Sequence, residues 1–210
     1  MQTLILFLIL ISTYLMTSAK RVPALVRSFQ YQSFGLFLAT LIEAAREGSP
    51  GLYAIAALVF ILKVSLIPRV LLAVARKIKA NEDLGLLINP QLSLFMALTL
   101  TYVSWIFAGQ LVSSGGEGKT MLAIAFFVVL AGLFLMIFRM TALAQVIGLC
   151  VMENGLFLLA ASISGGMPFF VEIAIFFDVL VSVLIMGFFV YRINRLFTHI
   201  DVDKLTRLKG

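Results

Sequence analysis

Long apolar runs alternate with short polar or glycine- and proline-rich segments along the chain. A helix needs roughly 20 apolar residues to cross the hydrocarbon core of a bilayer. Seven runs approach or exceed that length: residues 3–19, 24–45, 51–75, 92–112, 121–138, 141–163 and 169–191. None alternates with the period of two that a transmembrane β-strand would show. The pattern predicts an all-α, polytopic membrane protein with about seven transmembrane helices.

The composition supports this prediction. Of the 210 residues, 62% are hydrophobic and 12% are charged, and the mean hydropathy is +1.11. Soluble domains average about 45–50% apolar and about 25% charged residues, so a soluble globular fold and a disordered chain are both excluded. The single cysteine, Cys150, cannot form an internal disulfide or hold an iron–sulfur cluster by itself.

Basic residues fall mainly on one side of the predicted helices. Thirteen of the 16 lie near or beyond the carboxyl ends of the first, third, fifth and seventh runs: Lys20, Arg21, Arg27, Arg69, Arg76, Lys77, Lys79, Arg139, Arg192, Arg195, Lys204, Arg207 and Lys209. By the positive-inside rule, this bias predicts an inner-membrane protein with its amino terminus outside and its carboxyl terminus in the cytoplasm. Because topology explains the net charge, nucleic acid is not an expected partner.

No basic residue precedes the first run, so we expect a retained span rather than a signal peptide.

Two features that could suggest chemistry have simpler explanations. Residues 113–120 end in the Gly-Lys-Thr of a phosphate-binding loop, but Ser113 replaces the first glycine and no strand precedes it. A short loop between helices is expected there. His199 has no second ligand at metal-binding spacing. We therefore expect no metal site and no catalytic constellation on this chain.

Three ionisable side chains lie near the middle of predicted spans. Glu153 and Lys63 each come about 18 Å of helix after the start of their runs, and Asp178 lies about 15 Å beyond Pro168. In a hydrocarbon core roughly 30 Å thick, these positions are central. A charged side chain there costs about 2.5–3.5 kcal/mol or more, and such residues usually mark ion or proton pathways. Glu153, Asp178 and Lys63 are the primary candidates.

Polar groups lie close to all three candidate charges in the sequence. Asn154 follows Glu153, and Ser182 lies one helical turn beyond Asp178. Pro68 has no N–H, so the Val64 carbonyl, next to Lys63, should lack its helical donor. Glu172 lies about one turn inside its run and could reach the external interface. Asn154, Ser182 and Glu172 are accessory candidates.

Two interpretations of the three central charges remain open. Lys63 could neutralise one carboxylate in a static ion pair that orders the helices. Two acids and one base would still leave one carboxylate uncompensated, and such groups are suited to proton exchange. The proton-transfer interpretation is favoured.

A weak internal repeat suggests the domain organisation. Residues 31–39 match residues 151–159 through Gly-Leu-Phe-Leu at a shift of 120, and Lys63 falls opposite Asp178 at a shift of 115, each in the third helix of its set. The prediction is a three-helix unit at residues 1–80, a linking helix within 81–118, a second three-helix unit at 119–197 and a cytoplasmic tail at 198–210.

Several motifs resemble the E component of hydrogenase-4. They are Cys-Val-Met-Glu-Asn-Gly at 150–155, Val-Glu-Ile at 171–173 with Asp178, Phe-Ile-Leu-Lys-Val at 60–64, and the terminus at 201–210 ending in Leu-Lys-Gly. More distantly, the last three runs resemble the K-type membrane subunit of respiratory complex I and the C subunit of multisubunit cation/proton antiporters.

This resemblance implies a membrane-arm subunit of a formate hydrogenlyase or related energy-converting hydrogenase. In the K-type subunit two intramembrane glutamates lie on the proton path; Glu153 matches the first, and Asp178 is the nearest match to the second. Expected partners are lipid, antiporter-like and anchor membrane subunits, and cytoplasmic hydrogenase subunits. The nickel–iron and iron–sulfur centres would reside on those partners, with no cofactor on this chain.

Three functions therefore compete. The leading hypothesis is a subunit without redox chemistry whose midplane carboxylates move protons or cations during electron transfer in its partners. The second is a structural subunit with static buried charges that joins larger subunits, or a subunit of a multisubunit cation/proton antiporter. The third is a stand-alone transporter, which the short loops and few central charges disfavour.

Overall fold

The computed structural model describes residues 2–77, 88–112 and 117–163. This part of the chain is helical: α1 (Gln2–Ser18), α2 (Val22–Glu47), α3 (Pro50–Val59), the π-helix η1 (Phe60–Leu66), α4 (Ile67–Lys77), α5 (Pro90–Leu111), α6 (Glu117–Phe138) and α7 (Ala142–Ile163). The first six apolar runs each coincide with one helix or, for residues 51–75, with the continuous segment α3–η1–α4.

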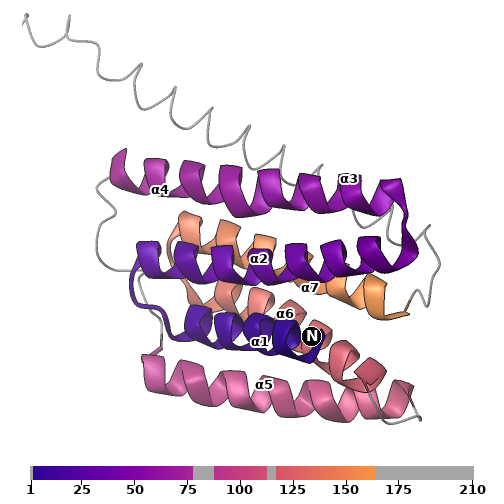
Figure 1. Ribbon diagram of the computed structural model, residues 1–210. Coiled ribbons are helices and arrows are strands. Elements are labelled where there is room, and N and C mark those ends of the chain that lie inside the picture. Colours follow the sequence, from indigo (N-terminus) through magenta and orange to yellow (C-terminus); the bar gives the residue numbers. More distant parts are fainter. Residues whose placement is uncertain (1, 78–87, 113–116, 164–210) are drawn as a thin grey trace, which may run out of the picture.

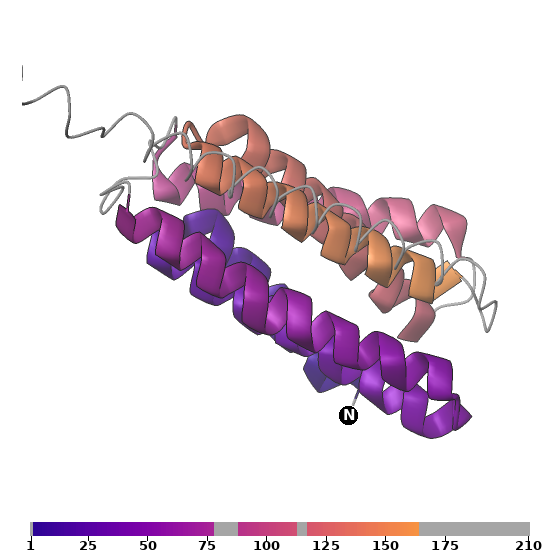
Figure 2. The same cartoon turned by 90° about the horizontal axis from the view of Figure 1, so that it is seen from above.

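The helices lie side by side with roughly parallel axes (Figure 1). The segment α3–η1–α4 forms one edge, α5 forms the opposite edge, and α1, α2, α6 and α7 lie between them. Seen from above, α1 to α4 make one layer and α5 to α7 make a second (Figure 2). Contacts of α2 with α7 and of α1 with α5 and α6 join the two layers.

Proline and glycine set several helix boundaries. Pro50 and Pro90 occupy first helical positions, where a missing N–H costs nothing. Gly48 ends α2 with φ at 62°, a left-handed conformation in which its N–H bonds the carbonyl of Ala44. Pro68 lies just after the π-helical segment and cannot donate to the preceding turn. These residues explain why the breaks occur where they do.

Four helical segments are long and apolar enough to cross a membrane: Pro50–Arg76, Pro90–Leu111, Gly118–Phe138 and Ala142–Ser162. Thr3–Ser18 is apolar but shorter, and α2 carries four charged side chains: Arg27, Glu43, Arg46 and Glu47. The run at 169–191 lies outside the described residues. The all-helical, multi-pass class is confirmed, whereas the count of seven spans and the division into two units stay predictions.

Glycines allow α6 and α7 to pack with their backbones in close contact. A Cβ added to Gly132 would lie 2.5 Å from the backbone nitrogen of Met152. A Cβ on Gly155 would lie 2.6 Å from the backbone nitrogen of Val129. Small residues are the usual means by which membrane helices approach this closely. The close approach fixes α7, the helix that carries Glu153, against α6.

Replacing Gly132 by alanine should therefore destabilise the protein. Because backbone atoms of α7 would have to move, we expect a loss of about 1–3 kcal/mol, typical of overpacking. Gly118→Ala is the control, since a Cβ there meets nothing within 4 Å. Thermal unfolding in detergent can be followed by the reaction of a thiol dye with the buried Cys150. Equal midpoints for both variants would contradict the tight helix contact.

Candidate functional site

Two of the three predicted central charges lie in the interior of the described bundle. Lys63 is fully buried in η1, and Glu153, in the middle of α7, is 9% exposed. They come from different layers of the helix bundle (Figure 2). Asp178, Ser182 and Glu172 lie outside the described residues, so their predicted roles stay predictions.

The backbone around Lys63 departs from the α-helix. Residues Phe60–Leu66 form a π-helix, a rare form that often occurs at functional sites. The sequence predicts that Pro68 leaves the Val64 carbonyl without a helical donor. In the structure, the side chain of Gln30 donates from Nε2 to that carbonyl at 2.9 Å. A side chain of α2 therefore satisfies a backbone group next to Lys63.

A buried hydrogen-bonded network links Lys63 to three other helices. The Lys63 ammonium donates to Asn154 Oδ1 at 2.7 Å. Asn154 Nδ2 donates to Gln32 Oε1 at 3.0 Å and to Ser33 Oγ at 3.2 Å. Gln32 Nε2 donates in turn to Thr13 Oγ1 at 2.8 Å. The five residues come from η1, α7, α2 and α1, and we call them the Asn154 network.

One partner of Lys63 is an amide. Sequence reasoning considered Glu153 and Asp178 as its partners and named Asn154 only as an accessory residue. The ammonium donates to the side chain directly after Glu153 in α7, and the expected pairing with Asp178 lies outside the described residues. Lys63 therefore lies beside the α7 turn that carries the candidate carboxylate.

Sequence reasoning missed Gln32, Ser33 and Thr13. Gln32, like Gln30, interrupts the apolar run 24–45, and an amide in a membrane helix commonly bonds a neighbouring helix. Ser33 corresponds to Glu153 in the internal repeat. The amide in the apolar run and the internal repeat are both visible in the sequence, but neither shows which helix Gln32 or Ser33 faces.

Arg139 forms a second buried polar contact between the layers. This side chain, between α6 and α7, is 2% exposed, and its Nη2 donates to the Thr17 carbonyl at 2.6 Å. Burial lowers the pKa of Arg139 to about 10, so the guanidinium stays charged at neutral pH. The sequence assigned Arg139 to membrane topology, whereas the structure places it at the carboxyl end of α1.

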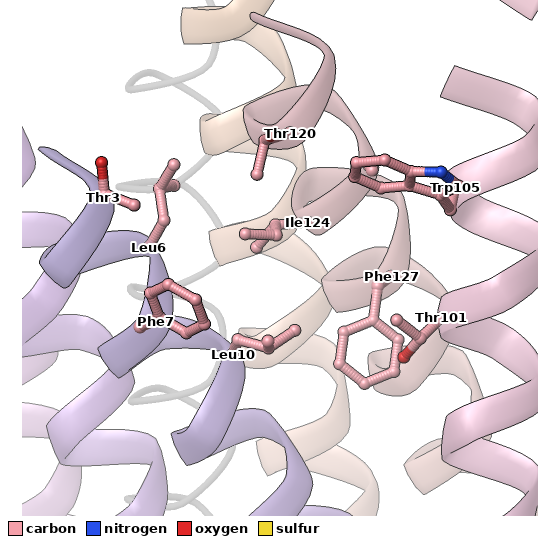
Figure 3. Close-up of a pocket in the computed structure, with 10 residues that line it drawn as sticks. Thr3, Leu6, Phe7, Leu10, Thr101, Trp105, Thr120, Ile124 and Phe127 are labelled. Atoms are coloured by element: carbon pink, nitrogen blue, oxygen red, sulfur yellow. The ribbon is translucent and has the colours of Figure 1, made fainter. Parts of the chain in front are cut away.

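An apolar groove of about 140 Å³ lies between α1, α5 and α6 (Figure 3). Leu6, Phe7, Ile124 and Phe127 are among the side chains that line it. In the same region, the Tyr14 hydroxyl bonds to Thr101 Oγ1 at 2.6 Å, which joins α1 to α5. The groove offers apolar contact rather than charged or nucleophilic groups.

The phosphate-loop resemblance has no support in the described structure. Lys119 belongs to the first turn of α6, and its ammonium lies 4.7 Å from the centre of the Trp105 ring. That position indicates a cation–π contact with α5. Residues 113–116 and His199 lie outside the described residues. Among the described residues, no group of three or more His, Cys, Asp or Glu side chains could hold a metal.

The apolar helices and buried polar network define a multi-pass helical membrane protein. An uncharacterized protein of Mycobacterium tuberculosis is 29% identical over 204 residues, which cover 96% of this chain and 92% of that protein. Hydrogenase-4 component E of Escherichia coli K12 is 32% identical over 152 residues, covering 72% of this chain and 70% of that protein. Component E of Shigella flexneri matches to the same extent.

This chain therefore belongs to the hydrogenase-4 component E family. No protein-family model matches the chain. No solved structure matches it. The relation to the complex I subunit stays a prediction.

Proposed function

We propose that this chain is a membrane-arm subunit of an energy-converting hydrogenase related to formate hydrogenlyase. It performs no redox chemistry itself, and Glu153 and Lys63 contribute to a proton or cation path near the membrane midplane. Electron transfer in partner subunits drives the movement. The observation that carries this proposal is the burial of both side chains among apolar helices, since such burial is costly and usually functional.

The partners follow from the same proposal. Antiporter-like and anchor subunits would contact this chain in the membrane, and hydrogenase subunits would bind on the cytoplasmic side. Those subunits would carry the nickel–iron and iron–sulfur centres, because one cysteine cannot supply the ligands of a cluster. Asp178 would be the second carboxylate of the path, as the family resemblance implies.

Charge distribution supports the orientation in the inner membrane. Lys20 and Arg21 follow α1, Arg76 lies near the end of α4, and Arg139 follows α6. Successive helices run in opposite directions, so these ends share one side of the bundle (Figure 1). We assign this side to the cytoplasm by the positive-inside rule.

The second candidate is a purely structural subunit. The Asn154 network supports it, because neutral amides bridging two layers would order the bundle whether or not any ion moves. This alternative predicts that the network affects assembly and stability alone.

A Glu153→Gln variant of the whole complex separates the two candidates. Glutamine keeps the side-chain size but cannot release a proton near neutral pH, so the variant should evolve hydrogen normally and lose proton movement. Inverted membrane vesicles allow both measurements, with a hydrogen electrode and a pH-sensitive dye. Formate or reduced ferredoxin, whichever the complex accepts, supplies the electrons.

Glu43→Gln is the matched control. The Glu43 side chain is 45% exposed and lies 3.7 Å from Arg46, so its charge is in contact with solvent. The control should retain the normal ratio of protons moved to hydrogen evolved. An unchanged ratio in Glu153→Gln would reject the path through this carboxylate and leave the structural candidate.

A further inference from the structure

We infer that the groove between α1, α5 and α6 binds one acyl chain of an anionic phospholipid, whose phosphate is held by the ammonium of Lys119. The groove and this positive charge meet at Trp105, which lines the groove and has its ring centre 4.7 Å from Lys119 Nζ. The inference goes beyond the proposed ion path, because the groove shares no residue with the Asn154 network.

The groove has the size and the lining that one hydrocarbon chain requires. Its volume is about 140 Å³, and its lining includes Leu6 and Leu10 of α1 and Ile124 and Phe127 of α6 (Figure 3). An apolar cavity of about 150 Å³ can hold a benzene molecule, so a stretch of several methylene groups fits here. A chain in the groove gains van der Waals contacts with the helices that an empty groove would lose.

The groove lies at the end of the bundle where α1 and α6 begin. Thr3 and Leu10 are seven residues apart in α1, as are Thr120 and Phe127 in α6, so the lining extends along about 10 Å of helix. Half of a bilayer's hydrocarbon core is about 15 Å thick. Trp105 is exposed, and tryptophan is enriched at the boundary of the membrane. This position suits a lipid whose headgroup stays at the boundary while one chain extends inward.

Lys119 places a positive charge at the same end. It belongs to the first turn of α6 and precedes Thr120, which lines the groove. Gly109 of α5 leaves room for it, since a Cβ there would lie 3.1 Å from Lys119 Nζ. Among the described residues, no carboxylate forms an ion pair with Lys119. Its N–H groups can therefore donate to a phosphate oxygen in a charge-assisted hydrogen bond while the ammonium stays against Trp105.

Trp105 is the single tryptophan of the chain, so its fluorescence reports on this site. The purified chain is reconstituted into bilayers that mix anionic phosphatidylglycerol with phosphatidylcholine, which has no net charge. Bromine atoms on the acyl chains of one lipid at a time quench a tryptophan that they contact. Two titrations then give the relative binding constant of the two lipids at Trp105. We expect a roughly tenfold preference for phosphatidylglycerol, the scale of one charge-assisted hydrogen bond.

Lys119→Gln tests the headgroup contact. Glutamine removes the charge and keeps a polar side chain, so the preference for phosphatidylglycerol should disappear. Lys20→Gln is the control, because Lys20 is an exposed lysine that follows α1 at the opposite end of the bundle. The control should keep the preference of the original chain.

Leu6→Phe tests the chain contact. The larger ring narrows the groove, so the preference should fall several-fold although Lys119 is still present. Leu4→Phe is the matched control in the same helix, since Leu4 is 73% exposed and does not line the groove. Neither substitution adds a second tryptophan.

A relative binding constant near one in the original chain would overturn the inference and leave ordinary boundary lipid. A preference that survives in Lys119→Gln, or that is equal in Leu6→Phe and Leu4→Phe, would also overturn it. Quenching that is weak for both lipids and falls further at high protein-to-lipid ratio would mean that a second copy covers the groove instead. These results leave the proposed ion path untouched, since Glu153→Gln tests that path separately.

Discussion

A Lys63→Met variant of the complex is expected to evolve hydrogen while moving few or no protons. Methionine preserves most of the buried volume but removes the only cation of the Asn154 network. The variant should also be less abundant, because a buried amide oxygen that loses its donor costs about 1–3 kcal/mol. Proton uptake per hydrogen evolved and the amount of complex in the membrane are the two measurements.

The double variant Lys63→Met/Asn154→Leu separates charge from structure. Replacing both partners of a buried polar contact by apolar groups of similar shape is often nearly neutral for stability. We therefore expect the amount of complex to recover in the double variant and proton movement to remain lost. If Lys63 only orders the bundle, proton movement should recover together with assembly.

Lys119→Met is the matched control for these variants. Lys119 is half-buried at the start of α6, where its ammonium contacts Trp105 and has no part in the Asn154 network. Its removal should change the abundance of the complex only slightly. The ratio of protons moved to hydrogen evolved should stay the same. A loss of proton movement in this control would mean that any missing cation uncouples the complex, and would argue against a special role for Lys63.

The sequence was sufficient to predict the helices because apolar length is a strong signal. Runs 92–112, 121–138 and 141–163 match α5, α6 and α7 closely. Pro68 also directed attention to the Val64 carbonyl, which accepts a hydrogen bond from Gln30, a partner that could not be predicted. Local signals of this kind depend on a few neighbouring residues, so they can be interpreted from sequence.

The contacts between helices could not be predicted in the same way. Helices α6 and α7 are apolar around most of their circumference, so the pattern does not indicate which side faces another helix. The sequence consequently placed Lys63 and Glu153 within helices but did not predict their neighbours. Gln32 and Thr13 entered the site only through the packing of α1 and α2 against α7.

Arg139 is another residue whose contact with a neighbouring helix could not be predicted from the sequence. A basic residue after an apolar run usually lies in solvent at the membrane surface, and no neighbouring residue indicates a different position for Arg139. In the structure its guanidinium reaches back across the bundle to the last turn of α1. A residue assigned to topology therefore also has a packing role.

Arg139→Ala is expected to destabilise the protein by about 2–3 kcal/mol, the scale of one buried charge-assisted hydrogen bond together with the packing of its side chain. The Thr17 carbonyl belongs to the last turn of α1, where backbone oxygens lack helical partners and a positive charge is favourable. For a chain of this length, the thermal midpoint in detergent should fall by roughly 5–10 °C. Arg139→Lys should lie between the alanine variant and the original protein.

Arg46→Ala provides the comparison. Arg46 lies 3.7 Å from Glu43 in an exposed ion pair, and such pairs contribute about 0–1 kcal/mol to stability. The contact of Arg139 with Thr17 is one of the ties between the two layers at the end of the bundle assigned to the cytoplasm. Its loss should separate α1 from α6 at that end and leave the Asn154 network, which bonds α7 to α2 and η1, in place. Equal midpoints for Arg139→Ala and Arg46→Ala would mean that helix packing alone holds the layers together.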